Sequence, residues 1–126
     1  MASYQKPVYS RGMLAEEDLF EKQFHYVGFG TTGAVIKGGA TGAIGAGFLE
    51  NFPAIGSATN IMTIGGGAKA VAAEVVSAAN LELRADANGQ MAIADTAGDI
   101  VVAISQEAAA ISDKFEVRPV LYRKHA

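Results

Sequence analysis

The sequence predicts a mainly all-β protein, a small β-sandwich or barrel of short antiparallel strands built from a duplicated unit. The first observation is composition. Half of the 126 residues are hydrophobic but only 8% are aromatic, and many apolar positions are Ala or Val. Such side chains suit thin β layers better than a bulky helical core. The second observation is that twelve of the fifteen glycines lie between Gly28 and Gly67, among short apolar runs. The third is an internal repeat.

The repeat relates seven apolar or glycine positions to seven others 56 residues later (42 to 98). Four pairs are identical and three are conservative apolar exchanges. The pairs are Gly42–Gly98, Ile44–Ile100, Phe48–Ile104, Ala54–Ala110, Ile55–Ile111, Ile61–Val117 and Ile64–Val120. Two copies are too few for a solenoid. We therefore expect a duplicated β-unit that closes one small core.

The second copy of this unit gives the clearest strand pattern. A Gly98-Asp99 turn precedes a β-branched run in which Ile100, Val102 and Ile104 share one face of a strand. Residues 108–113 form a compact connection, and residues 115–120 form the next strand with alternating polarity. This unit is the β-hairpin around which the rest of the chain is arranged.

The remaining strands are bounded by turn residues. We expect strands at residues 26–29 and 34–37, and a pair at 43–49 and 60–64 around the corner at 53–56. Strands at 81–85 and 91–94 flank Asn88-Gly89, the strongest hairpin signal in the sequence. Residues 68–73 are expected as a strand. A helix over 68–79 is the alternative, which the valines in this segment disfavour.

The first 25 residues differ in character and predict an N-terminal arm, followed by a β domain over residues 26–126. Residues 1–12 lack periodicity and are expected to be extended. Residues 13–24 match about three helical turns, with Phe20 and Phe24 four positions apart. So short a helix needs a surface to lie on. It packs either on its own domain or, as we prefer, on a neighbouring subunit.

Composition argues against several classes of function. The net charge of −3 disfavours a nucleic-acid-binding surface, and the absence of cysteine excludes disulfide and thiol chemistry. The uncharged run at residues 38–49 is too short and too rich in glycine to span a membrane. Acidic residues at positions 16–18 and the lack of an apolar run predict that there is no signal peptide.

We also expect no catalytic, cofactor or metal site. A G-x-G-x-x-G pattern begins at Gly28, but the glycines at 38 and 39 preclude the helix that a dinucleotide site needs. His25 and His125 are distant in sequence and there is no cysteine, which disfavours a transition-metal site. Asp86 and Asn88 are better explained by a hairpin turn than by calcium binding. The inventory thus predicts a protein that is not an enzyme.

Two motifs resemble the capsid decoration or cement proteins of tailed bacteriophages. The run from Leu83 to Gln90, followed by residues 98–110, is similar to that family's "K-A-D-A-N-G-K" hairpin and the strand after it. Residues 47–61 resemble its other recurring segment. The likeness covers roughly residues 26–120. It departs at Ala103 and at Ser112, where the family often has Gly, and these small-for-small changes leave the fold inference standing.

The resemblance implies a structural protein on the outer surface of the virion capsid, which cements neighbouring major capsid protein subunits, often as a homotrimer. Aromatic and apolar anchors are favoured at interfaces. From composition and position we predict these partner-binding residues: Tyr4, Tyr9, Arg11, Leu14, Leu19, Phe20 and Phe24. The alternative is a capsid-surface adhesion or head-fibre module that binds host glycans. It needs an exposed aromatic, for which Phe48, Phe52 and Phe115 are the candidates, although their placement favours the core.

Overall fold

The computed structural model describes residues 14–30, 35–38, 45, 47–64 and 66–125, and the part of the chain so described contains strands and turns but no helix. The all-β prediction is therefore confirmed. The ten strands are β1 (Leu14–Ala15), β2 (Tyr26–Phe29), β3 (Val35–Gly38), β4 (Gly47–Leu49), β5 (Ile61–Met62), β6 (Ala68–Val71), β7 (Glu82–Ala85), β8 (Met91–Ile93), β9 (Ile100–Ser105) and β10 (Lys114–Arg123).

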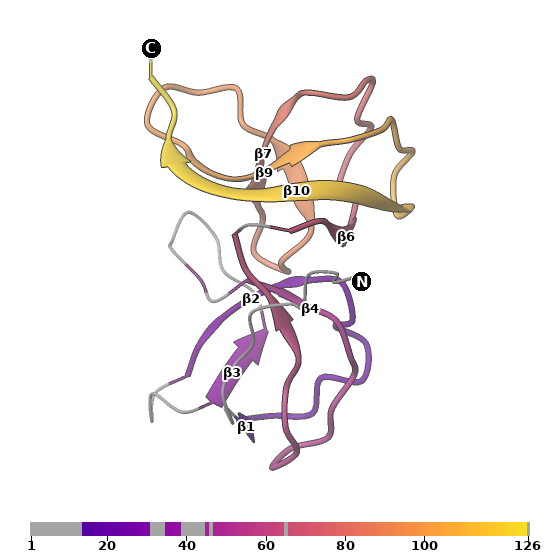
Figure 1. The fold of residues 1–126 in the computed structure, drawn as a ribbon, viewed down its shortest axis with the longest axis vertical. Coiled ribbons are helices and arrows are strands. Elements are labelled where there is room, and N and C mark those ends of the chain that lie inside the picture. Colours follow the sequence, from indigo (N-terminus) through magenta and orange to yellow (C-terminus); the bar gives the residue numbers. More distant parts are fainter. Residues whose placement is uncertain (1–13, 31–34, 39–44, 46, 65, 126) are drawn as a thin grey trace, which may run out of the picture.

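The strands form two five-stranded sheets that follow one another along the chain. The first has the order β1-β3-β2-β4-β5 and the second the order β6-β10-β9-β7-β8. All pairings are antiparallel except that of β1 with β3. Figure 1 shows the sheets as two lobes stacked along the long axis, β1–β5 below and β6–β10 above. We call β1–β5 repeat 1 and β6–β10 repeat 2.

The two repeats have the same strand register, which confirms the predicted duplication. Most equivalent residues are 56 positions apart (49 to 105). The matching Cα pairs are Tyr26–Phe48 and Glu82–Ile104, Val27–Gly47 and Leu83–Ala103, and Leu49–Ile61 and Ser105–Val117. Of the seven aligned pairs, the two that include Gly42 and Ile44 lie outside the described residues. The repeat is thus a property of the backbone pairing as well as of the sequence.

Each sheet is bridged from one edge to the other. In repeat 1, Leu14 of β1 pairs with Val35 of β3 and also bridges Ala58, just before β5. In repeat 2, β6 pairs with β10, and Ala72 after β6 bridges Met91 of β8. Each repeat therefore approaches a closed five-stranded barrel, which leaves few unpaired edges.

Residues 14–25 of the predicted arm over 1–25 belong to repeat 1, whereas residues 1–13 lie outside the described residues. The prediction of a helix at 13–24 is wrong for the described residues 14–24. Instead, the N–H of Leu19 donates to the carbonyl oxygen of Pro53 at 2.9 Å, and Phe24 has a φ of 70°, which an α-helix does not allow. The alternative helix at 68–79 is also absent, because β6 ends at Val71 and turns follow.

One of the hydrophobic clusters is shared by the two repeats, and a smaller one lies within repeat 1 alone. Tyr26 and Phe48 of repeat 1 pack in the same buried cluster as Leu83, Val102 and Phe115 of repeat 2. The rings of Tyr26 and Phe48 meet edge to face, with centroids 5.1 Å apart. The predicted hairpin at Asn88-Gly89 is confirmed, and the carbonyl oxygen of Gly89 accepts a 2.8 Å hydrogen bond from the N–H of Tyr26. The two lobes are therefore joined by packing and by a backbone hydrogen bond.

Candidate binding surface

The predicted partner-binding residues do not gather at one place. Tyr4, Tyr9 and Arg11 lie outside the described residues. Leu19 is fully buried in the core of repeat 1, so its side chain offers no surface to a partner. Phe24 is partly buried. Leu14 and Phe20 are exposed, Phe20 to 58%. Two of the seven predicted residues are thus large apolar side chains at the surface.

Leu14 and Phe20 lie on a segment that is fastened to the corner between β4 and β5. The N–H of Ala15 donates to the carbonyl oxygen of Ser57, and the N–H of Gly56 donates to that of Ala15, both at 2.9 Å. Asp18 Oδ1 accepts a 2.8 Å hydrogen bond from the N–H of Ile55. Residues 14–20 and 52–58 therefore lie side by side, at the end of repeat 1 remote from repeat 2 (Figure 1).

The corner itself supplies two more exposed apolar side chains. Phe52 is 57% and Ile55 is 62% exposed. We name the surface formed by residues 14–20 and 52–58 the end surface; its exposed large apolar residues are Leu14, Phe20, Phe52 and Ile55. The expectation that Phe52 belongs to the core is wrong, whereas Phe48 and Phe115 are buried as expected. Ile55 was not predicted as a contact residue, although its place before a corner glycine is a signal of exposure.

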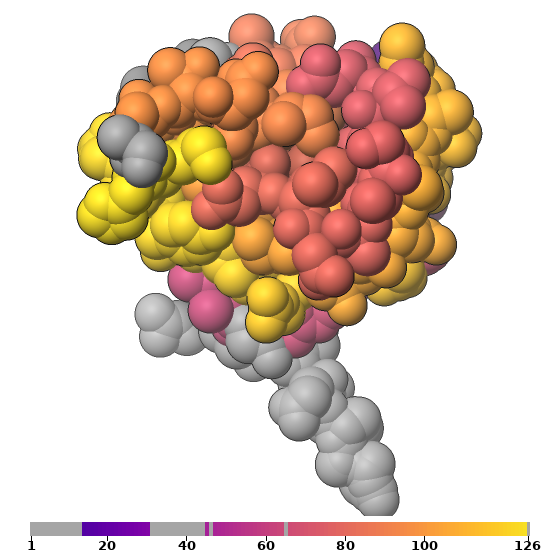
Figure 2. Space-filling model, turned by 90° about the horizontal axis from the view of Figure 1, so that it is seen from above, coloured from indigo at the N-terminus to yellow at the C-terminus, as the bar shows by residue number. Residues whose placement is uncertain are grey.

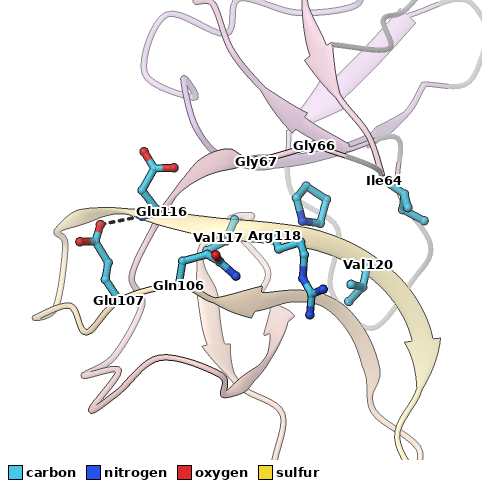
Figure 3. Close-up of a pocket in the computed structure, with 10 residues that line it drawn as sticks. Ile64, Gly66, Gly67, Gln106, Glu107, Glu116, Val117, Arg118 and Val120 are labelled. Carbon is cyan, nitrogen blue, oxygen red and sulfur yellow. Dashed lines mark hydrogen bonds between the residues drawn. The ribbon is translucent and has the colours of Figure 1, made fainter. Parts of the chain in front are cut away.

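A second surface feature is a cleft of about 600 Å³ between the repeats (Figure 3). Its walls are the connection at Ile64, Gly66 and Gly67 and the strand from Glu116 to Val120. The polar groups here serve the fold. Glu107 Oε2 accepts a 2.9 Å hydrogen bond from the N–H of Glu116, and the Glu116 carboxylate pairs with Lys69 at 3.1 Å. Among the described residues that line the cleft, none is a Ser, Thr, Cys or Lys nucleophile beside a general base.

Titratable groups are perturbed by structural contacts. Burial lowers the pKa of His25, whose Nδ1 lies 3.2 Å from the carbonyl oxygen of Gln23. Burial, and next the charge of Glu116, raise the pKa of Glu50. The hydroxyl of Tyr122 donates to Glu82, which raises the pKa of Tyr122 to about 12. These groups do not converge on a common site.

Two structural features are absent from the described residues. No group of three or more His, Asp or Glu side chains there is placed to hold a metal ion. In the same part of the chain, no helix is long and apolar enough to cross a membrane. The end surface is therefore the strongest candidate site in the part of the chain that the structure describes.

The second end of the molecule is made by repeat 2. Figure 2, which views the molecule from that end, shows a rounded face built from residues of β6–β10 and their connections, with repeat 1 largely hidden behind it. The two repeats thus present opposite ends to the surroundings, and the end surface belongs to one of them.

Comparisons with known proteins identify the fold. No protein-family model matches the sequence, and no curated protein matches it either. A solved structure, the N base of head fibre gp8.5 in bacteriophage phi29, is similar with a TM-score of 0.65 and 14% sequence identity. The similarity covers 85% of this chain and 89% of that one. At this identity the likeness establishes a shared fold.

Proposed function

We propose that this protein is a structural component of a tailed-phage virion, which binds the outer surface of the capsid and cements neighbouring major capsid protein subunits. The observation that carries the proposal is the fold shared with a phage head-fibre base over most of both chains. The resemblance of residues 26–120 to capsid decoration proteins points independently to the same kind of virion. No catalytic role, nucleic-acid partner or membrane partner forms part of the proposal.

The physical basis would be many weak contacts acting together. The end surface offers four exposed large apolar side chains, whereas a stable one-to-one interface usually buries about 20–30 residues on each side. A homotrimer on a lattice of capsid subunits would engage several such contacts at once, and the effective concentration of the later contacts would multiply the affinity. Cyclic symmetry would let the same interface be used three times.

The head-fibre fold also favours a second function, a head-fibre module that attaches to the capsid and carries an adhesive activity toward host glycans. The two functions share capsid binding but differ in its consequence. A cement protein raises the resistance of the shell to heat or denaturant. A fibre base leaves that resistance unchanged, and an adhesive module binds glycans, with the exposed Phe52 as the aromatic candidate.

Co-sedimentation with empty heads of the phage that encodes this chain tests the proposal. We expect saturable binding, a trimer by size exclusion with light scattering, and decorated heads that withstand a higher temperature than bare ones. Binding without a gain in head stability would favour the fibre base. A glycan-array signal abolished by Phe52→Ala would favour the adhesive module. A chain that stays in the supernatant at all concentrations would refute capsid binding.

A further inference from the structure

The two repeats provide an internal comparison for the end surface. The backbone contacts that fasten residues 14–20 to the corner recur in repeat 2. Leu19 N–H donates to the carbonyl oxygen of Pro53, and Val76 N–H donates to that of Ala109, each at 2.9 Å. Leu19 and Val76 are both buried. In this segment equivalent residues are 57 positions apart (19 to 76). The side chains of repeat 1 can therefore be compared directly with those at the equivalent positions of repeat 2.

At the equivalent positions of the end surface, exposed aromatic side chains occur in repeat 1 and not in repeat 2. Phe20 corresponds to Ser77, and Phe52 corresponds to Ala108, and all four positions are exposed. Repeat 2 forms the same hydrogen bonds with small side chains at these positions, so the fold does not require a phenylalanine there. Exposing a large aromatic side chain without a structural need is typical of a binding surface. Ile55 and its counterpart Ile111 are exposed to similar extents, 62% and 60%, and do not differ.

The two repeats also differ in charge. Residues 14–24 contain one basic residue, Lys22, and four acidic ones: Glu16, Glu17, Asp18 and Glu21. At the positions of repeat 2 equivalent to these four acidic residues, one residue is acidic, Glu74. The other three are Ala73, Val75 and Ala78. Glu17, Asp18 and Glu21 are exposed. The end surface therefore combines exposed aromatic side chains with an acidic rim made of Glu17, Asp18 and the adjoining Glu21. The equivalent part of repeat 2 is less acidic, because there Glu74 and Asp113 are accompanied by the basic Lys114.

We infer that the end surface is the face by which this protein docks on the capsid, against a patch of the major capsid protein with an apolar centre and a Lys- or Arg-rich rim, while repeat 2 faces away from the shell. This inference rests on the proposed function. An apolar centre with a polar rim is the usual anatomy of a protein interface. Opposite charge on the partner's rim would steer and orient the encounter.

Charge also decides against a two-fold contact between the end surfaces of two copies of this chain. An isologous contact places the same patch of both copies face to face. Here it would bring the acidic rim of one copy onto the acidic rim of the other, and like charges at close range are unfavourable. A basic partner surface relieves this repulsion, which is why we assign the end surface to a different protein.

The test uses two sets of variants of the full chain in co-sedimentation with empty heads. The first is the double variant Phe20→Ser with Phe52→Ala, which installs the residues that repeat 2 already carries. The second is the matched pair Ile55→Ala and Ile111→Ala, the same change at equivalent positions of the two repeats. We expect the double variant to bind about tenfold more weakly or worse, Ile55→Ala to bind more weakly, and Ile111→Ala to bind like the wild type. Circular dichroism and urea midpoints establish that each variant is folded.

A charge reversal tests the rim. We expect Glu21→Lys to weaken binding, and added salt to weaken the wild type more than this variant, because salt screens exposed charges. If the double variant binds heads as tightly as the wild type does, the inference is overturned and the proposed function stays intact. Equal losses for Ile55→Ala and Ile111→Ala would overturn the one-ended geometry. A double variant that binds heads normally but loses its oligomeric state would assign the end surface to a second copy. A wild type that does not bind heads would overturn both proposals.

Discussion

Replacing Leu19 by Ala tests whether residues 14–25 are part of the fold. The Leu19 side chain is fully buried in a small cluster whose other members are Ala15, Val27, Leu49 and Ile61. Leu→Ala removes three carbons, and at about 0.8 kcal/mol for each this gives about 2.4 kcal/mol of lost burial. The cavity left behind adds to this figure, since a core relaxes only in part. We expect the free energy of unfolding to fall by about 3–4 kcal/mol.

Two variants calibrate the measurement. Val76→Ala removes two carbons at the equivalent buried position of repeat 2, so we expect a smaller loss of about 2–3 kcal/mol. Phe20→Ala, one residue along the chain but exposed, should change stability by less than about 0.5 kcal/mol. Urea unfolding followed by circular dichroism gives all three values. If Leu19→Ala were as mild as Phe20→Ala, the segment would be an arm and not part of the repeat 1 core.

Three further predictions concern the backbone and pH. Gly89→Ala should lower the free energy of unfolding by about 2–4 kcal/mol in urea titrations, because φ is +82° and a Cβ would collide with the carbonyl oxygen of Tyr26. Ser112→Gly should raise the thermal unfolding midpoint, because Ser112 adopts a φ of 72° where the equivalent residue of repeat 1 is Gly56 with a φ of 83°; a lowered midpoint would contradict this reasoning. Burial lowers the pKa of His25. Below about pH 6.5 the unfolded state therefore takes up a proton that the folded state does not, and the free energy of unfolding falls as the pH falls. Urea midpoints measured from pH 7 to 5 should decline less steeply in His25→Gln than in the wild type.

The sequence contained enough information to predict the strand register of the two repeats. The offset of 56 was found from apolar and glycine positions, and it relates the Leu49–Ile61 pair to the Ser105–Val117 pair. A one-residue slip would turn every side chain to the opposite face of its strand, so a periodic apolar pattern specifies the register strongly. The hairpin at Gly89 was predictable for a local reason, since its turn needs a positive φ.

The structure of residues 14–24 was missed because its decisive contacts are distant in sequence. The four-residue spacing of Phe20 and Phe24 fits a helix, but the segment is held by hydrogen bonds to the corner near Pro53. A signal was present. Ala15, Glu17 and Leu19 match Ala72, Glu74 and Val76 at an offset of 57, one more than elsewhere in the chain (19 to 76). The single-residue difference hid this part of the repeat from a search at one fixed offset.

The end surface was predictable only in part, for a physical reason. Leu14 and Phe20 were identified because an apolar residue in a charged segment stands out. Phe52 was assigned to the core, because in a small β protein an aromatic residue beside a proline fits a packed corner as well as an exposed one. Whether such a side chain is buried or exposed depends on which other residues cover the corner. Residues 14–20 fasten its backbone and leave the Phe52 and Ile55 side chains at the surface.

Duplication explains how one small fold can carry both a scaffold and a specialised face. Repeat 2 shows which side chains the barrel needs, because it closes the same hydrogen bonds with Ser77 and Ala108 where repeat 1 has aromatic residues. Tyr26 and Phe48 of repeat 1 pack in a buried cluster together with residues of repeat 2. Because Ser77 occupies the equivalent position of repeat 2, the fold does not require the Phe20 side chain. On this argument the differences between equivalent positions, more than the residues that the repeats share, mark the surface that we propose as the docking site.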